Sequence, residues 1–230
     1  LKPQEKIYAI VPSFTWSGTI NSLIVNNIEP IFCDIDETLT IDIEKVKKNF
    51  NKLKKIKKKI RFIILVSNYG NIPDVKNLKI FLKEKKIIPL LDSAPAFGST
   101  FKKKFINNFG IDEMFSFHAT KVLSSMEGGC VISNHKDIIN NLKYLRDFGQ
   151  FEKSIGNIKL PGLNSKMQEI SAIVGNENLK NFQKNLKKRT LILNQYKKFF
   201  SNFEKKGVLS TMKINPDVFC VHSYFPILLN

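Results

Sequence analysis

Short apolar runs that alternate with helical patterns constrain the fold of this chain more than any other feature. Six runs have the length of strands, at residues 7–11, 30–33, 62–66, 87–91, 114–117 and 130–133. Helical patterns lie between or after them, at residues 18–27, 42–53, 74–85 and 136–148. Strands that alternate with helices form a mostly parallel sheet covered on both faces. The sequence therefore predicts an α/β fold.

The last third of the chain begins as a long helical region. Apolar side chains recur with helical spacing from residue 169 to about residue 203. Gly175 and Asn176 interrupt this pattern, and we expect the helix to break there.

A lysine in a turn is the first candidate for chemistry. Residues 116–121 (SFHATK) end on Lys121, and Glu127, Gly128 and Gly129 follow shortly after. A turn rich in Ser, Thr and Gly can present an amine to a pocket, which is the setting of a Schiff-base lysine. The alternative is a solvated surface lysine, because Lys and Arg together number 37.

An acid follows another strand-length run. Asp92 comes directly after residues 87–91, and the small residues Ser93 and Ala94 follow it. The carboxyl ends of strands in an open α/β sheet deliver side chains to the ligand crevice, where a carboxylate could pair with a cationic ring nitrogen. Asp is equally suited to capping a turn, so spacing alone leaves both roles open.

Five segments in order carry a resemblance to a known family: residues 11–16 (VPSFTW), 30–36 (PIFCDID), 92–98 (DSAPAFG), 116–129 (SFHATKVLSSMEGG) and 162–169 (GLNSKMQE). The chain resembles the DegT/DnrJ-type nucleotide-sugar aminotransferases, which are pyridoxal-phosphate (PLP) enzymes of fold type I, the aspartate-aminotransferase fold. The resemblance implies a PLP-binding large domain at residues 1–182, then a linking helix and the start of a small α/β domain at residues 183–230. Family members are longer, so we expect this chain to be a fragment of one.

The resemblance assigns roles to the lysine and the acid. Lys121 matches the lysine that binds PLP as a Schiff base and then carries the proton in transamination. A subgroup of the family has histidine there and dehydrates sugars, so Lys121 favours transamination. Asp92 matches the aspartate that keeps the pyridine nitrogen protonated.

Three further residues match cofactor contacts. Ser116 matches the serine that binds the PLP phosphate, and Trp16 the aromatic side chain that lies against the PLP ring. Without the resemblance, Trp16 would be read as core. Asn164 matches the asparagine that reaches the cofactor of the neighbouring subunit, which implies a homodimer with shared active sites. Gly128 and Gly129 match a turn near the cofactor, although a simple bend into a strand also explains them.

One position departs from the family pattern. Where the family has Gln or His near the phenolic oxygen of PLP, this chain has Pro95, which offers no donor. Asn68 could replace that donor, and a turn over residues 67–70 is the other interpretation.

The net charge of +17 raises nucleic acid as a partner. Arg61, Arg146 and Arg189 are the only arginines, whereas readers of phosphates and bases favour that side chain. We therefore expect a solvated basic surface that attracts anionic nucleotide sugars, with no nucleic-acid or membrane partner.

The three cysteines and three histidines lack the spacing of a disulfide framework or a metal site. We expect buried thiols in a reducing, cytoplasmic compartment, no metal, and a pocket or core position for His118. No apolar run is long enough to span a bilayer.

Together these observations predict a PLP-dependent sugar aminotransferase of the EC 2.6.1 type. The resemblance implies an amino group transferred from glutamate to a dTDP-4-keto-6-deoxy type sugar, for surface polysaccharide or other glycan biosynthesis. A dehydratase or regulatory relative of the same fold is the alternative, and a basic nucleic-acid-binding domain a distant one.

Overall fold

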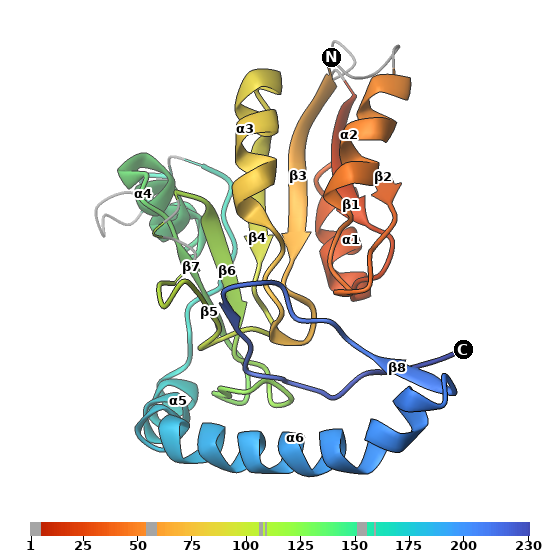
Figure 1. Ribbon diagram of the computed structural model, residues 1–230. Helices are drawn as coiled ribbons and strands as arrows, with labels where there is room; N and C mark the ends of the chain where they lie inside the picture. The colour runs from red at the N-terminus through yellow and green to blue at the C-terminus, as the bar shows by residue number, and fades with distance from the viewer. Residues whose placement is uncertain (1–5, 54–58, 106–107, 109, 151–155, 159) are drawn as a thin grey trace.

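The computed structural model describes residues 6–53, 59–105, 108, 110–150, 156–158 and 160–230. Its centre is a six-stranded sheet with the order β2-β1-β3-β4-β6-β7 (Figure 1). The strands are β1 (Ile7–Pro12), β2 (Ile28–Cys33), β3 (Ile60–Val66), β4 (Ile88–Asp92), β6 (Asp112–Ser116) and β7 (Gly129–Ile132). All neighbouring pairs are parallel except β6 and β7. The prediction of a mostly parallel α/β sheet is confirmed.

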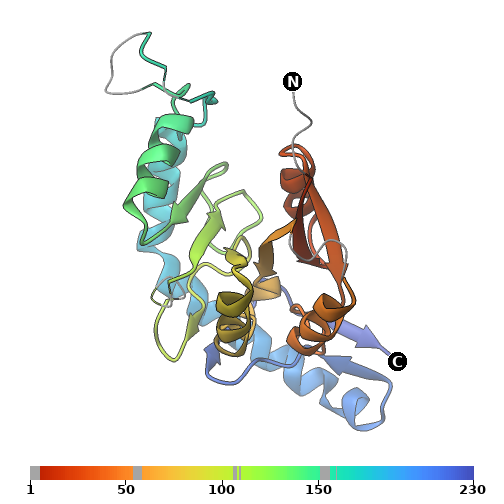
Figure 2. The ribbon, with the colours of Figure 1, turned by 90° about the horizontal axis from the view of Figure 1, so that it is seen from above.

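Helices cover both faces of this sheet. They are α1 (Ser17–Ile24), α2 (Ile43–Lys52) and α3 (Val75–Lys85), whereas α4 (Lys136–Leu145), which follows β7, has no buried side chain. Seen from above, α2 and α3 lie on one side of the sheet and α1 on the other (Figure 2). The start of α2 is fixed by Asp42, whose side chain accepts a hydrogen bond from the backbone N–H of Lys45.

The core follows the alternation of side chains along β3. Ile63 and Leu65 pack with α2 and α3, in the larger of two buried clusters on the sheet. Ile64 and Val66 point to the opposite face, where Leu23 of α1 covers them. A strand buried on both faces must be apolar throughout, which explains why it reads as a continuous apolar run.

The rest of the chain wraps the end of the sheet at which the parallel strands finish. α5 (Glu169–Lys180) leads into α6 (Phe182–Lys205), which runs below those strand ends (Figure 1). The C-terminal segment then returns between α6 and the sheet. Its strands are short, β8 (Leu209–Thr211) paired with β10 (Ile227–Leu229), and β9 (Val218–Phe219) paired with β5 (Thr100–Phe101).

Asn71 ties this C-terminal segment to the sheet. Its side chain is fully buried, and Nδ2 donates to the carbonyl oxygens of Thr38 (3.0 Å) and Lys213 (2.8 Å). Its Oδ1 accepts from the backbone N–H of Asn215 at 3.1 Å. The amide thus satisfies three backbone groups that no regular strand pairs.

The expected helix break at Gly175 and Asn176 is wrong. α5 continues through both residues, and Asn181 separates it from α6. A Cβ at Gly175 would lie 3.0 Å from Cβ of Ser125, so the glycine permits close packing rather than ending the helix. The division into domains at residue 182 stays a prediction.

Candidate active site

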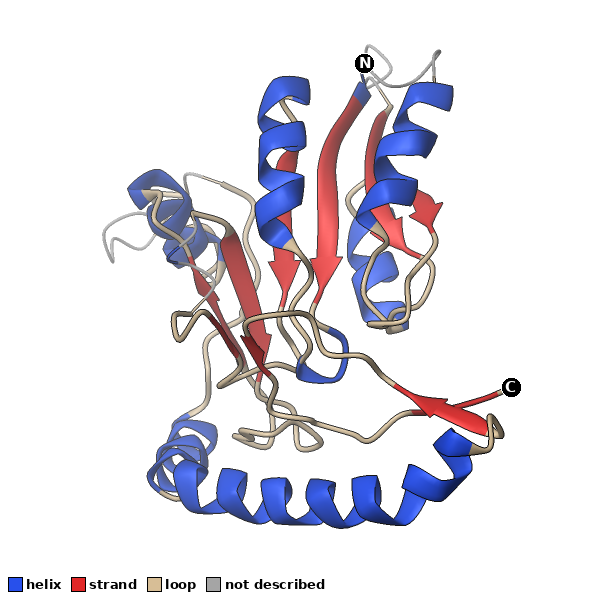
Figure 3. Cartoon of the chain, viewed as in Figure 1, coloured by secondary structure: helices blue, strands red, loops and turns tan. Residues whose placement is uncertain are grey.

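Two of the predicted site residues end neighbouring strands. Asp92 is the last residue of β4 and Ser116 the last of β6, and Asp92 pairs in register with Met114. The loops that follow gather at this edge of the sheet (Figure 3). The fold therefore delivers a carboxylate and a hydroxyl to the same edge, as parallel strands do at a ligand crevice.

The carboxylate of Asp92 is held by two donors. Oδ1 accepts from the backbone N–H of Ala94 at 3.1 Å, and Oδ2 accepts from Thr19 Oγ1 at 2.8 Å. Thr15 Oγ1 donates in turn to Thr19 Oγ1 at 3.0 Å. The bond to Ala94 is the turn cap that the sequence allowed, and the bond to Thr19 links Asp92 to the first turn of α1.

No cation neutralises this carboxylate within the part of the chain that the structure describes. Asp92 is half-buried, and neither Lys, Arg nor His forms an ion pair with it there. A buried carboxylate is costly unless it is paired and hydrogen-bonded, and here only the hydrogen bonds are supplied by the protein. The Asp92 carboxylate is therefore suited to pair with a cationic group of a ligand, such as a protonated ring nitrogen.

Lys121 lies in the loop between β6 and β7, which is closed by backbone hydrogen bonds. Phe117 N–H donates to the Gly128 carbonyl at 2.8 Å, and Ser125 N–H to the Phe117 carbonyl at 2.8 Å. The Lys121 N–H donates to the His118 carbonyl at 2.9 Å. Lys121 is half-buried, so this closed loop holds it at the surface of the site.

Phe97 joins the loop after β4 to its surroundings, a feature that sequence reasoning missed. Its ring meets those of Phe115, Phe117 and Phe182 edge to face, with centroids 5.5, 5.8 and 5.3 Å apart. Leu123, two residues after Lys121, is buried in the same cluster. The loops that carry Asp92 and Lys121 are thus anchored to one aromatic core together with α6.

Packing within the chain explains the two glycines. A Cβ at Gly129 would lie 2.7 Å from the Phe115 carbonyl oxygen, across the β6–β7 pair. At Gly128, where φ is +148°, a Cβ would lie 2.5 Å from the Met167 methyl carbon. These contacts support a bend into a strand, and the turn near the cofactor stays a prediction.

Ser116 and His118 make local contacts. Ser116 Oγ accepts from the backbone N–H of His118 at 3.3 Å. The ring of His118 is exposed, with Nδ1 3.0 Å from Thr120 Oγ1 and Nε2 3.5 Å from a Glu127 oxygen. The expectation of a core histidine is wrong, because this ring is exposed, and a pocket position stays a prediction.

Trp16 and Asn164 are both exposed. Trp16 is the N-cap residue of α1 and is 81% exposed, and its carbonyl accepts from the Thr19 N–H. Asn164 forms an isolated bridge with Asp147, beyond the end of α4. Trp16 therefore belongs to the element that contacts Asp92, whereas Asn164 makes no contact with the other predicted residues within the described part of the chain.

Asn68 does not offer the donor that Pro95 lacks. Its Nδ2 donates to the carbonyl oxygens of Phe14 (3.0 Å) and Leu39 (2.7 Å), so both amide hydrogens are engaged. Residues Asn68–Gly70 form a 3-10 turn. The turn interpretation is thus the correct one, and Asn68 serves to join two loops.

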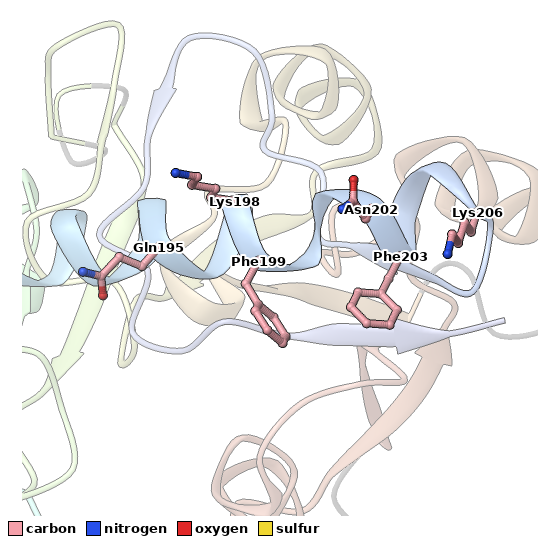
Figure 4. Close-up of a pocket in the computed structure, with 6 residues that line it drawn as sticks. All are labelled: Gln195, Lys198, Phe199, Asn202, Phe203 and Lys206. Atoms are coloured by element: carbon pink, nitrogen blue, oxygen red, sulfur yellow. The ribbon is translucent and has the colours of Figure 1, made fainter.

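A hollow also lies elsewhere, along α6. Gln195, Lys198, Phe199, Asn202, Phe203 and Lys206 line it (Figure 4). None of the predicted site residues is among them. One helix supplies nearly all of this lining, which is typical of an exposed helix face rather than a catalytic crevice.

The described residues hold neither a metal site nor a membrane-spanning helix. No group of three or more His, Cys, Asp or Glu side chains there could hold a metal ion. Within the same ranges, no helix has the length and apolar character that crossing a bilayer requires. All three cysteines are free, and burial raises the pKa of Cys33 to about 11 and of Cys220 to about 12.

This chain matches known proteins over almost its whole length. The model of the DegT/DnrJ/EryC1/StrS aminotransferase family matches residues 2–230. A UDP-4-amino-4,6-dideoxy-N-acetyl-beta-L-altrosamine transaminase of Campylobacter jejuni is 33% identical, over 98% of this chain and 59% of its own length. A GDP-4-keto-6-deoxy-D-mannose 3-dehydratase of Escherichia coli is 30% identical, over 78% of this chain and 49% of its own length.

The solved structures agree in fold. A Helicobacter pylori aminotransferase involved in the biosynthesis of pseudoaminic acid aligns with a TM-score of 0.87 and 23% identity, over 99% of this chain and 60% of that one. This likeness confirms the predicted fold. The chain spans between about half and three fifths of the length of these relatives.

Proposed function

The chain belongs to the DegT/DnrJ/EryC1/StrS aminotransferase family, and we propose that its protein uses PLP to transfer an amino group to a keto group of a nucleotide-linked sugar. One observation carries the proposal. A half-buried carboxylate without a cationic partner among the described residues lies at the sheet edge from which the Lys121 loop extends. A cationic cofactor with an electrophilic carbon fits that pair of groups.

Asp92 would hold the ring nitrogen in its protonated form. When bound, PLP supplies an electron sink for the carbanion formed at the reacting carbon. The protein's share is to keep a negative charge at the nitrogen, and Thr19 and Ala94 orient the carboxylate for that purpose. A fixed charge needs no reorganisation during the reaction.

Lys121 would act as both anchor and base. Its Nζ would bind the cofactor covalently and, once freed by the amino donor, move a proton at the reacting carbon. The loop is suited to this because its backbone is closed by hydrogen bonds and anchored through Leu123. Only the side chain then needs to move.

Ser116 and Trp16 would complete the cofactor site within one chain. Ser116 Oγ would donate to the phosphate, and Trp16 would cover one face of the ring from the start of α1. Both positions suit these roles, because Ser116 ends a strand at the site edge and Trp16 is free of packing contacts that would hold it elsewhere.

We propose that Asn164 serves the cofactor of a second copy of the chain. It lies beside Asp147 and makes no contact with Asp92, Ser116 or Lys121 among the described residues. Residues near it in the sequence include exposed apolar side chains, among them Leu163 (73% exposed) and Ile170 (56% exposed). Apolar side chains at the surface support a dimer interface there.

The sugar is proposed as a 4-keto-6-deoxy type, and glutamate as the amino donor. The HATK form of the lysine motif resembles that of family members acting on dTDP-linked sugars, and the matched relatives carry UDP, GDP or dTDP in their names. All three nucleotides are anionic, and a chain with a net charge of +17 attracts any of them. We place the reaction in a reducing, cytoplasmic compartment because the three thiols are free.

A sugar dehydratase is the second candidate, favoured by the similarity to the Escherichia coli 3-dehydratase. The residue at position 121 separates the two. Transamination needs a base that returns a proton to the carbon bearing the new amine, and Lys121 can supply it.

The experiment is to reconstitute the protein with PLP and incubate it with 15N-glutamate and dTDP-, UDP- or GDP-linked 4-keto-6-deoxy sugars. Mass spectrometry should show 15N in an amino sugar nucleotide. Loss of water from the sugar without gain of nitrogen would instead establish the dehydratase, and absence of PLP binding would refute both.

A further inference from the structure

Two threonines from the first turn of α1 and the loop before it reach toward Asp92. Thr15 Oγ1 donates to Thr19 Oγ1, which donates to Asp92 Oδ2. We propose that Thr19 is a positioning residue that fixes the plane of the Asp92 carboxylate toward the ring nitrogen of the cofactor, and that Thr15 supports it. The inference rests on the proposed PLP site.

The two bonds to Asp92 differ in kind. The bond from Ala94 is local, since Ala94 lies two residues further along the chain. The bond from Thr19 comes from a separate element, 73 residues away in sequence. A carboxylate held at one oxygen can still turn about its Cβ–Cγ bond, whereas donors on both oxygens fix its plane. The bond from Thr19 is therefore the one that sets the orientation.

Thr15 determines the direction of the bond. A threonine hydroxyl has one hydrogen to donate and lone pairs to accept. Because Thr15 donates to Thr19, the single hydrogen of Thr19 is left for Asp92. A chain of hydroxyls that ends on a charged acceptor strengthens each bond in it.

Burial makes this contact more than a surface interaction. Thr19 is 9% exposed, and its backbone N–H is engaged with the Trp16 carbonyl. Trp16 and Thr19 lie three residues apart at the start of one helix, and so share one side of it. The element proposed to cover the ring thus also holds the acid proposed to bind its nitrogen.

Thr19→Val and Thr19→Ser separate this role from plain packing. Valine keeps the shape and removes the hydroxyl, and serine keeps the hydroxyl. Each variant is loaded with PLP labelled with 15N at the ring nitrogen, whose NMR shift reports protonation. PLP affinity is measured by titration, and thermal unfolding of the cofactor-free protein reports the fold.

Thr19→Val should bind PLP about tenfold more weakly, the effect of losing a hydrogen bond to a charged group, and shift the ring nitrogen resonance toward the unprotonated form. Thr19→Ser should resemble wild type. Thr40→Val is the matched control, because Thr40 is also buried and bonds to the hydroxyl of Thr38. It should leave the nitrogen resonance unchanged.

The proposal would be overturned if Thr19→Val kept the PLP affinity and the ring nitrogen resonance of the wild type. Equal losses of PLP affinity in Thr19→Val and Thr19→Ser would also overturn it, because they would indicate a packing effect. If Thr19→Val does not fold, Thr15→Val is measured instead. We expect a smaller shift of the ring nitrogen resonance in the same direction, and the absence of any shift would refute the positioning role of Thr19. Failure of the wild-type protein to bind PLP would refute the proposed function itself.

Discussion

The rings of Phe97 and Phe182 meet edge to face with centroids 5.3 Å apart, joining the loop after Asp92 to the first residue of α6. Phe182 is 6% exposed, and its ring occupies the space that a side chain at Gly98 would take. This contact holds together two segments that the sequence alone places far apart.

Phe182→Ala should therefore lower the free energy of unfolding by about 3 to 5 kcal/mol, the usual cost of removing a buried aromatic side chain. Urea titration followed by circular dichroism measures it. Phe199→Ala is the control on the same helix, because Phe199 is 65% exposed. Equal losses in the two variants would show that the cluster around Phe97 is not a stabilising core.

Lys121→Ala should abolish amino transfer and leave the fold intact, because a half-buried side chain in a loop contributes little to packing. Borohydride reduction followed by peptide mass spectrometry should find the cofactor on Lys121 in wild type and no adduct in the variant. Lys187→Ala, at an exposed position of α6, is the control. Normal turnover with a reducible adduct still present would refute the assignment.

Asp92→Asn should retain bound PLP but lose activity by about 100-fold or more, the scale of loss when a preorganised electrostatic group is removed. The amide keeps an oxygen for the Ala94 N–H and removes the charge that keeps the ring nitrogen protonated. Steady-state kinetics with saturating PLP tests this. Unchanged kcat would mean that Asp92 only caps its turn.

Mixing the Lys121→Ala and Asn164→Ala variants tests the shared site. If each Asn164 serves its partner, a mixed dimer combines both lesions in one site and leaves the other intact. Random exchange should restore about a quarter of wild-type activity, since half of the dimers carry one working site. No recovery, despite verified exchange and a clear defect in both parents, would argue for sites complete within one chain.

Acid should weaken the fold through His222. Burial, and then the nearby Lys197, lower the pKa of this histidine from 6.5 to about 4. Between these values the unfolded chain binds a proton that the folded chain does not, so the free energy of unfolding falls as pH drops from 6.5 toward 4. The stabilising effect is complete above pH 6.5.

His222→Asn should reduce this pH dependence, as measured by urea titrations at several pH values. Asparagine tolerates the positive φ of 49° at this position. His135→Asn is the control, because His135 is exposed and should leave the dependence as in wild type. An unaltered slope in His222→Asn would assign the acid sensitivity to other groups.

The centre of the sheet could be predicted from the sequence because β1 and β3 are buried on both faces over most of their length and read as apolar runs. The expected strand at 62–66 became Ile60–Val66, and the expected helix at 42–53 became Ile43–Lys52. The expected and observed ends of these two elements differ by only one or two residues, because local signals such as the Asp42 cap set them. The expected end of α4 at residue 148 lies three residues beyond its observed end at Leu145, where Arg146 is the C-cap residue.

The parts that failed depend on contacts between distant residues. Gly175 looked like a helix break because its neighbour Ser125 is 50 residues away, and Asn68 looked like a donor because its acceptors were unknown. The link from Thr19 to Asp92 was missed for the same reason. A signal did exist, since Thr15 and Thr19 are four residues apart at a helix start, directly after a strand that leads to the site.

The hydrogen bonds of Asn71 also bear on the order in which parts of this chain can fold. Its amide is satisfied only after residues 213 and 215 have been made, so a nascent chain still on the ribosome holds a sheet with an unfilled polar position beside it. Contacts of such long sequence separation form late, because the entropy of closing the loop must be overcome first. During synthesis Asn71 therefore lacks two of its three hydrogen-bond partners until residues 213 and 215 have docked.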